Sequence, residues 1–178
     1  MSQTAGSMGC IKIVRMLRQS DLDRFIGEGY IVVRSAFPTE LAEECRRSTA
    51  QQLDIDLTSP NTWRQAVIRG VPTGDCFKRA ANAPGLLDAI NQLVNPDPWQ
   101  VRPNLGAFVV RFPSKNDPGD AGWHIDSSFQ PPSDPRWFVN YRSKGRALLL
   151  LCLLSDVGMD DAPSRVVSGS HLAMARLL

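Results

Sequence analysis

The sequence predicts an α+β protein with helices in its first half and an antiparallel sheet in its second half. Apolar residues recur at helical spacing before about residue 95, whereas β-branched and aromatic runs separated by turn residues follow it. Neither an internal repeat nor an alternation of strands with helices occurs, which disfavours a parallel sheet. With 178 residues, 43% of them hydrophobic, the chain can form one domain. We expect this domain at residues 20–178, after a flexible tail at residues 1–19.

The charge, apolar and cysteine patterns exclude several classes of protein. There are 20 basic and 18 acidic side chains, so the formal charge of +2 provides no strong field for nucleic acid. The longest apolar run, residues 147–154, is far shorter than the ~20 residues of a membrane span, and basic side chains interrupt any signal peptide. The four cysteines have no C-x-x-C spacing. We therefore expect a cytoplasmic protein with reduced thiols and a small-molecule partner, and neither nucleic acid nor membrane as a partner.

Three helices are predicted in the first half of the chain. Ser20 can cap the first, and the Gly-Glu-Gly sequence at residues 27–29 ends it. The second begins at Pro38 and Thr39, with acidic residues early and basic residues later, an order that suits the helix dipole. The third follows Pro84 and has apolar residues on one face. These apolar residues are Leu86, Leu87, Ile90, Leu93 and Val94.

The second half of the chain is predicted to consist of strands and loops. Residues 146–154 are apolar on both faces, which predicts a central strand that is covered on both sides. Residues 113–122 and 130–135 are rich in proline and polar residues and are predicted to be loops. The predicted strands are residues 30–33, 100–112, 123–126, 138–141 and 146–154.

A His-x-Asp motif provides the one spacing that points to chemistry. On a strand, His124 and Asp126 project to the same side, about one pleat apart. An imidazole nitrogen and a carboxylate oxygen are two of the three donors in the 2-His-1-carboxylate triad that binds non-haem Fe(II). The motif is short, and the alternative interpretation is an exposed histidine beside a turn.

Four further segments accompany this motif in order along the chain. They are GYIVVRSAFP at 29–38, W-x-V-R-x-N-L-G from Trp99, RALLLLCLLSDVG at 146–158 followed by DDAPSR, and Gly-Ser-His at 169–171. Together with the His-x-Asp motif, these segments resemble the phytanoyl-CoA dioxygenase family of Fe(II)/2-oxoglutarate-dependent oxygenases. The resemblance covers about residues 20–178.

The resemblance implies a mainly β fold, the double-stranded β-helix or jelly-roll of eight antiparallel strands, with helices packed outside. It also implies that His124 and Asp126 bind Fe(II) at the mouth of the jelly-roll. There, O2 and the co-substrate 2-oxoglutarate would react to succinate and CO2 as a small substrate is hydroxylated. Substrates in this family include carboxylates, acyl-CoA thioesters and secondary metabolites. Halogenating relatives lack the carboxylate ligand, so Asp126 favours hydroxylation.

The family's third iron ligand, a distal histidine, has no clear counterpart in this sequence. His171 is the second of two histidines and belongs to the Gly-Ser-His turn, which in the family precedes the distal ligand. We expect His171 to bond backbone groups in that turn; the alternative is that it is the third ligand. In the family an arginine about ten residues beyond the distal histidine anchors 2-oxoglutarate, and Arg176 lies too near the end of the chain to be assigned this role.

We therefore expect the final jelly-roll strands to be missing, so that the chain is a fragment or a truncated relative. It would then be inactive by itself and could self-associate through an exposed sheet edge. The alternative function is that of a catalytically inactive relative with a binding or structural role.

Three further side chains are weaker candidates for the site. Trp137 can form a wall of the co-substrate or substrate pocket, with packing in the core or in a loop as the alternative. Arg69 and Arg102 can meet an anionic group of the substrate or co-substrate, although solvated surface arginines are the common case. The loop at residues 113–122 adjoins the His-x-Asp motif and is either a lid or a plain connection.

Overall fold

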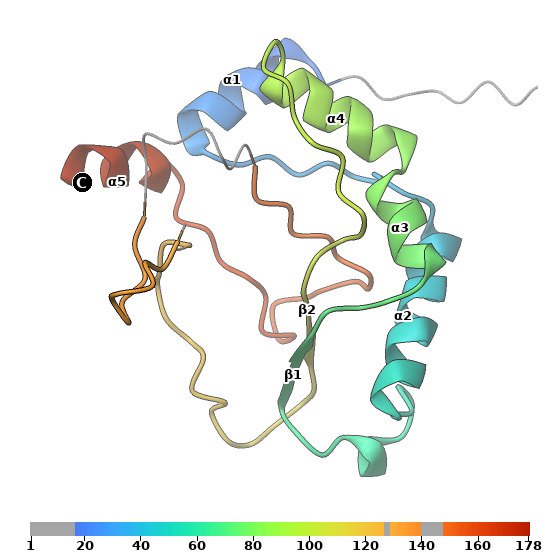
Figure 1. Ribbon diagram of the computed structural model, residues 1–178. Helices are drawn as coiled ribbons and strands as arrows, with labels where there is room; N and C mark the ends of the chain where they lie inside the picture. Colours follow the sequence, from blue (N-terminus) through green and yellow to red (C-terminus); the bar gives the residue numbers. More distant parts are fainter. Residues whose placement is uncertain (1–16, 127–128, 140–147) are drawn as a thin grey trace, which may run out of the picture.

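The computed structural model describes residues 17–126, 129–139 and 148–178. The helices are α1 (Gln19–Glu28), α2 (Thr39–Leu53), α3 (Asp75–Ala81), α4 (Pro84–Val94) and α5 (Ser170–Leu177), with a 3-10 turn at Pro60–Thr62. The strands are β1 (Val67–Gly70) and β2 (Phe108–Arg111). Figure 1 shows α2, α3 and α4 following one another along one side of the molecule, with α5 on the opposite side, beyond the end of α1.

Two apolar clusters form the core, and both lie among the helices. One contains Cys45 of α2 and Cys76, Phe77 and Ala80 of α3. The other consists of the α4 face with Leu86 and Ile90, together with Ala83 before it. Phe37, in the segment before α2, packs against both clusters and joins them into one core.

All three helices predicted from apolar spacing are confirmed, and one cap prediction is wrong. α1 begins at Gln19 rather than after Ser20, because the Asp21 carboxylate accepts a 3.0 Å bond from the backbone N–H of Arg18. α1 ends before Gly29, whose φ of +85° is accessible to glycine without strain. α2 begins directly after Pro38 as predicted.

The sheet within the described residues has two antiparallel strands, in which Val67 pairs with Arg111 and Gly70 with Phe108. β1 was not predicted from the sequence. β2 lies inside the predicted strand at residues 100–112 but covers its last part only. The chain turns before β2, since Asn104 Oδ1 accepts a 2.8 Å bond from the N–H of Gly106, which has a φ of +83°.

The other predicted strands are wrong where the structure describes them. Residues 30–33 and 123–126 form no strand. Of the predicted strand 138–141 the structure describes residues 138–139, of which Phe138 joins a single bridge, with Phe129. Residues 148–154 were predicted to be central and covered, yet Leu149 and Leu153 are 70% and 63% exposed. An extended segment becomes a strand only when a neighbour pairs with its backbone. The eight-stranded jelly-roll stays a prediction.

Part of the predicted tail contacts the helices. Most of the predicted tail at residues 1–19 lies outside the described residues, but Leu17 donates its N–H to Gln92 Oε1 of α4 at 3.0 Å. Residues 140–147, which include the start of the predicted central strand, also lie outside the described part. None of the helices described by the structure has the length and apolarity needed to cross a bilayer.

Candidate functional site

His124 and Asp126 lie side by side in an irregular segment that leads from the 113–122 loop toward Phe129. Their closest atoms, His124 Nε2 and Asp126 Oδ1, are 3.6 Å apart. The side chains are 77% and 47% exposed, so solvent reaches both donor atoms. The alternating spacing thus brought the two groups together, although the strand that was expected to position them is absent.

An imidazole nitrogen and a carboxylate oxygen suit Fe(II), but the third donor of the triad is not assembled. In the described part of the chain, no group of three or more histidine, cysteine, aspartate or glutamate side chains is placed to hold a metal ion. The donor types therefore fit the metal, whereas the number of donors does not. Two ligands leave the affinity and geometry of such a site weakly specified.

His171 belongs to a contact between α5 and α1. Its Nε2 lies 3.0 Å from the Ile26 carbonyl oxygen, which accepts the hydrogen bond, and the N–H of Gly169 donates to Glu28 O at 2.8 Å. These bonds satisfy two carbonyls at the end of α1 that have no partner within the helix. His171 thus bonds a backbone group, as expected, but from the first turn of a helix.

Gly29 is required by the same contact. A Cβ atom at this position would lie 2.4 Å from His171 Nδ1, and the φ of +85° is unfavourable for other residues. Two sequence segments that the family resemblance used, one beginning at Gly29 and the other at residues 169–171, are therefore in contact. In this structure their shared role is to dock α5 on α1.

Arg69 meets an anionic group, but it is one from its own chain. Arg69 of β1 and Arg111 of β2 lie on the same face of the sheet, because Arg69 pairs with Val109 and alternate residues share a face. Arg69 Nη2 lies 2.5 Å from Asp120 Oδ2, and the Arg111 guanidinium donates two bonds of 2.8 and 3.1 Å to the same carboxylate.

These arginines also explain the ionisation of Asp120. The hydrogen bond from Arg111, followed by that from Arg69, lowers the pKa of the Asp120 carboxyl below its ordinary value. Asp120 lies near the end of the 113–122 loop, so the two ion pairs fix that end to the sheet. A lid that moves as a whole would have to break both.

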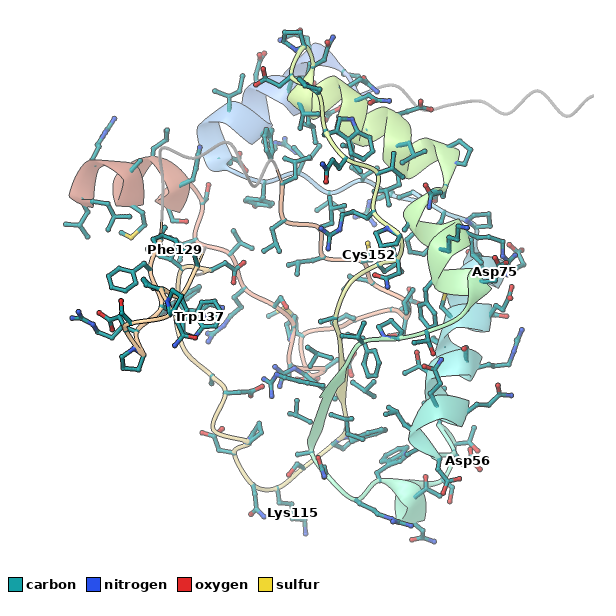
Figure 2. All side chains as sticks on the ribbon, in the orientation of Figure 1. Asp56, Asp75, Lys115, Phe129, Trp137 and Cys152 are labelled. Atoms are coloured by element: carbon teal, nitrogen blue, oxygen red, sulfur yellow. The ribbon has the colours of Figure 1, made fainter. Side chains whose placement is uncertain are left out.

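The two remaining candidates, Arg102 and Trp137, are both exposed. Arg102 is exposed, and its carbonyl accepts a 3.5 Å bond from Asn82 Nδ2. Trp137 is 62% exposed and lies near Phe129, at the end of the molecule occupied by α5 (Figure 2). Trp123 lies under Arg165, whose guanidinium carbon is 5.1 Å from the ring centroid.

Sequence reasoning missed a cavity of about 310 Å³ beside the sheet. Trp63 and Phe112 stack there with ring centroids 4.9 Å apart, and Arg64 and Asp117 also line the space. A second cavity, of about 280 Å³, lies against α4 and Trp99. The first cavity is lined by two distant segments, residues 63–66 and 112–118, so no local pattern indicates it, whereas the second is lined by residues 91–99 alone. Neither cavity is lined by His124 or Asp126.

The structure thus defines a small helical core, a two-stranded sheet and an exposed histidine–carboxylate pair. No protein-family model, curated protein or solved structure matches the chain. The family resemblance, the cofactors and the reaction therefore depend on the residues quoted above, and they stay predictions.

Proposed function

We propose that this chain binds Fe(II) through His124 and Asp126 and belongs to the Fe(II)/2-oxoglutarate-dependent dioxygenases. The observation that supports the proposal is the 3.6 Å contact between His124 Nε2 and Asp126 Oδ1 in an exposed position. One neutral nitrogen donor and one anionic oxygen donor are the pair that a non-haem Fe(II) site requires. Their exposure leaves the remaining coordination positions open to small ligands.

The proposed reaction is hydroxylation of a small organic molecule with 2-oxoglutarate and O2 as co-substrates. The substrate is a carboxylate, an acyl-CoA or a secondary metabolite. In this proposal the protein is cytoplasmic and acts on neither nucleic acid nor membranes. The bound metal would supply the oxidation chemistry, while His124 and Asp126 hold it and Asp126 occupies the position that a halogenating relative leaves to a halide.

Anaerobic titration with Fe(II) tests the metal site. We expect weak binding, because water must occupy the position of a third protein ligand. His124→Ala and Asp126→Ala should each reduce the affinity at least tenfold, which corresponds to about 1.4 kcal/mol. His171→Ala is the control and should leave the affinity unchanged. Equal affinity in the wild type and in the double variant lacking both donors would refute the site.

The second candidate function is a catalytically inactive relative with a binding or structural role. It is favoured by the number of donors, since the described residues bring two metal-ligand groups together rather than three. An assay of 2-oxoglutarate conversion to succinate with Fe(II), ascorbate and O2 separates the two functions. The dioxygenase requires succinate formation that His124→Ala abolishes, whereas the inactive relative gives background succinate even where Fe(II) binding is measurable.

A further inference from the structure

The helices α2 and α3 pack against each other with polar pairs at both ends of their contact. At one end, Gln52 Nε2 donates to Thr73 O at 2.8 Å, and Gln52 Oε1 accepts from Thr73 N at 3.0 Å. At the other end, the Arg79 guanidinium is paired with the Glu44 carboxylate. Residue numbers rise along α3 as they fall along α2, so the two segments run antiparallel (Figure 1).

Cys45 and Cys76 lie between these two polar pairs. Both thiols are free, Cys45 is fully buried and Cys76 is 5% exposed, and both belong to the core cluster that contains Phe77. The Cys76 thiol also contributes to the raised pKa of the Cys45 thiol, which indicates that the two side chains are neighbours in this cluster. Two cysteines on neighbouring helices in one packed cluster can be joined by a disulfide bond when their Cα atoms lie within about 7 Å of each other.

We propose that Cys45 and Cys76 are a site of covalent modification, at which a low-molecular-weight disulfide such as oxidised glutathione forms an intramolecular disulfide bond between α2 and α3. One cysteine thiolate attacks a glutathione sulfur, which forms a mixed disulfide and releases one glutathione. The other thiolate attacks the protein sulfur of that mixed disulfide and releases the second glutathione. The protein loses two protons and two electrons, and the electrons reduce one oxidised glutathione to two thiols.

The same burial that brings the thiols together slows their reaction. Burial, and after it the neighbouring Cys76 thiol, raises the pKa of the Cys45 thiol to about 12, so little Cys45 thiolate is present near neutral pH. A buried sulfur is also inaccessible to glutathione. The exchange therefore proceeds from a locally opened state in which α3, a helix of seven residues, separates from α2. The raised pKa affects the rate, whereas the fit of the bond in the closed fold determines the equilibrium.

Cys152 is the competing partner within the described residues. It is partly buried, and Leu154, two residues further on, packs against the cluster that contains Cys45 and Cys76. Cys10 lies outside the described residues. A test must therefore distinguish the proposed pair from bonds that involve Cys10 or Cys152.

The test measures the equilibrium of disulfide formation in a Cys10→Ser/Cys152→Ser protein that retains the proposed pair. The protein is equilibrated with mixtures of reduced and oxidised glutathione, in native buffer and in concentrated guanidinium chloride, then quenched with acid, alkylated and weighed by mass spectrometry. Equilibrium is approached from the reduced protein and from protein oxidised while unfolded, so slow opening does not obscure the result. We expect the ratio of disulfide to dithiol to be at least tenfold higher in the native state than in the unfolded state.

By thermodynamic linkage, the disulfide must raise the equilibrium constant of folding by the same factor by which the native state raises the disulfide-to-dithiol ratio. The oxidised protein should therefore have a higher Tm than the reduced protein. A native ratio equal to or below the unfolded ratio would overturn the proposal, as would a product in which glutathione stays attached to one cysteine. The matched control is Cys10→Ser/Cys45→Ser, which keeps Cys76 and Cys152. If the disulfide-to-dithiol ratio of Cys76 and Cys152 rises equally between the unfolded and the native state, then the closeness of Cys45 and Cys76 does not explain the increase.

Discussion

The helices α2, α3 and α4 bury apolar side chains in the core, whereas residues 148–167 expose most of theirs. Phe77 in α3 is fully buried and Ile90 in α4 nearly so, but Leu151 is 58% exposed although it belongs to the longest apolar run of the sequence. A helix satisfies its own backbone and needs one apolar face to dock, so neighbouring helices complete a core among themselves. An extended segment needs a paired strand as well, and apolar composition does not provide one.

The largest loss of stability is expected from the buried side of this comparison. Phe77→Ala should lower the free energy of unfolding by about 3–5 kcal/mol, because it removes a fully buried ring between α2 and α3. Such a loss is a large part of the 5–15 kcal/mol typical of a domain. Urea denaturation followed by circular dichroism measures it, and Phe77→Leu should cost clearly less. Equal, small losses for both variants would mean that the helices do not form the stable part of the molecule.

The contact between α1 and α5 is expected to give the next largest effect. Gly29→Ala places a Cβ atom 2.4 Å from His171 Nδ1 and requires a positive φ, so we expect a loss of about 1–3 kcal/mol. The matched control is Gly27→Ala, because a Cβ atom there meets no atom within 4 Å. If the clash matters, His171→Ala should recover part of the stability lost in Gly29→Ala. Identical unfolding curves for the two glycine variants would contradict the contact.

The attachment of the 113–122 loop should depend on pH. The pKa of Asp120 is lowered by Arg111 and Arg69, so this carboxylate stabilises the fold at pH values above the ordinary aspartate pKa of about 4. The stabilisation is lost as the pH falls through the lowered pKa, where the carboxylate takes up a proton. We expect Asp120→Asn to increase proteolysis in the loop at neutral pH, and by a smaller factor at pH 3. The control, Asp156→Asn, changes an exposed carboxylate and should have no effect at either pH.

The smallest effect on stability is expected from the exposed apolar segment. Leu151→Ala should change the free energy of unfolding by no more than about 0.5 kcal/mol, because the side chain is already largely in water.

The same surface should promote self-association, so replacing Leu149, Leu151 and Leu153 by lysine should shift light scattering toward the monomer. This would support self-association through an apolar surface rather than through the sheet edge predicted from the sequence. Destabilisation of the triple variant comparable to Phe77→Ala would mean that this segment is covered in solution.

The sequence by itself determined three of the five described helices, α1, α2 and α4, and the pairing of His124 with Asp126. The apolar face of α4 after Pro84 and the end of α1 at Gly29 are local patterns, because a helix forms bonds within four residues. The two side chains of the His-x-Asp motif are two residues apart, so their closeness is also local.

Only the tertiary structure decided which extended segments became strands and which groups met across the chain. Residues 148–154 have the composition of a central strand but no described backbone pairs with them, while β1 was not predicted and pairs with β2. The Arg69–Asp120–Arg111 cluster, the docking of His171 on α1 and the contact of Cys45 with Cys76 join residues that are 9 to 145 positions apart. Such contacts depend on how the chain closes its loops, and composition and periodicity do not specify this.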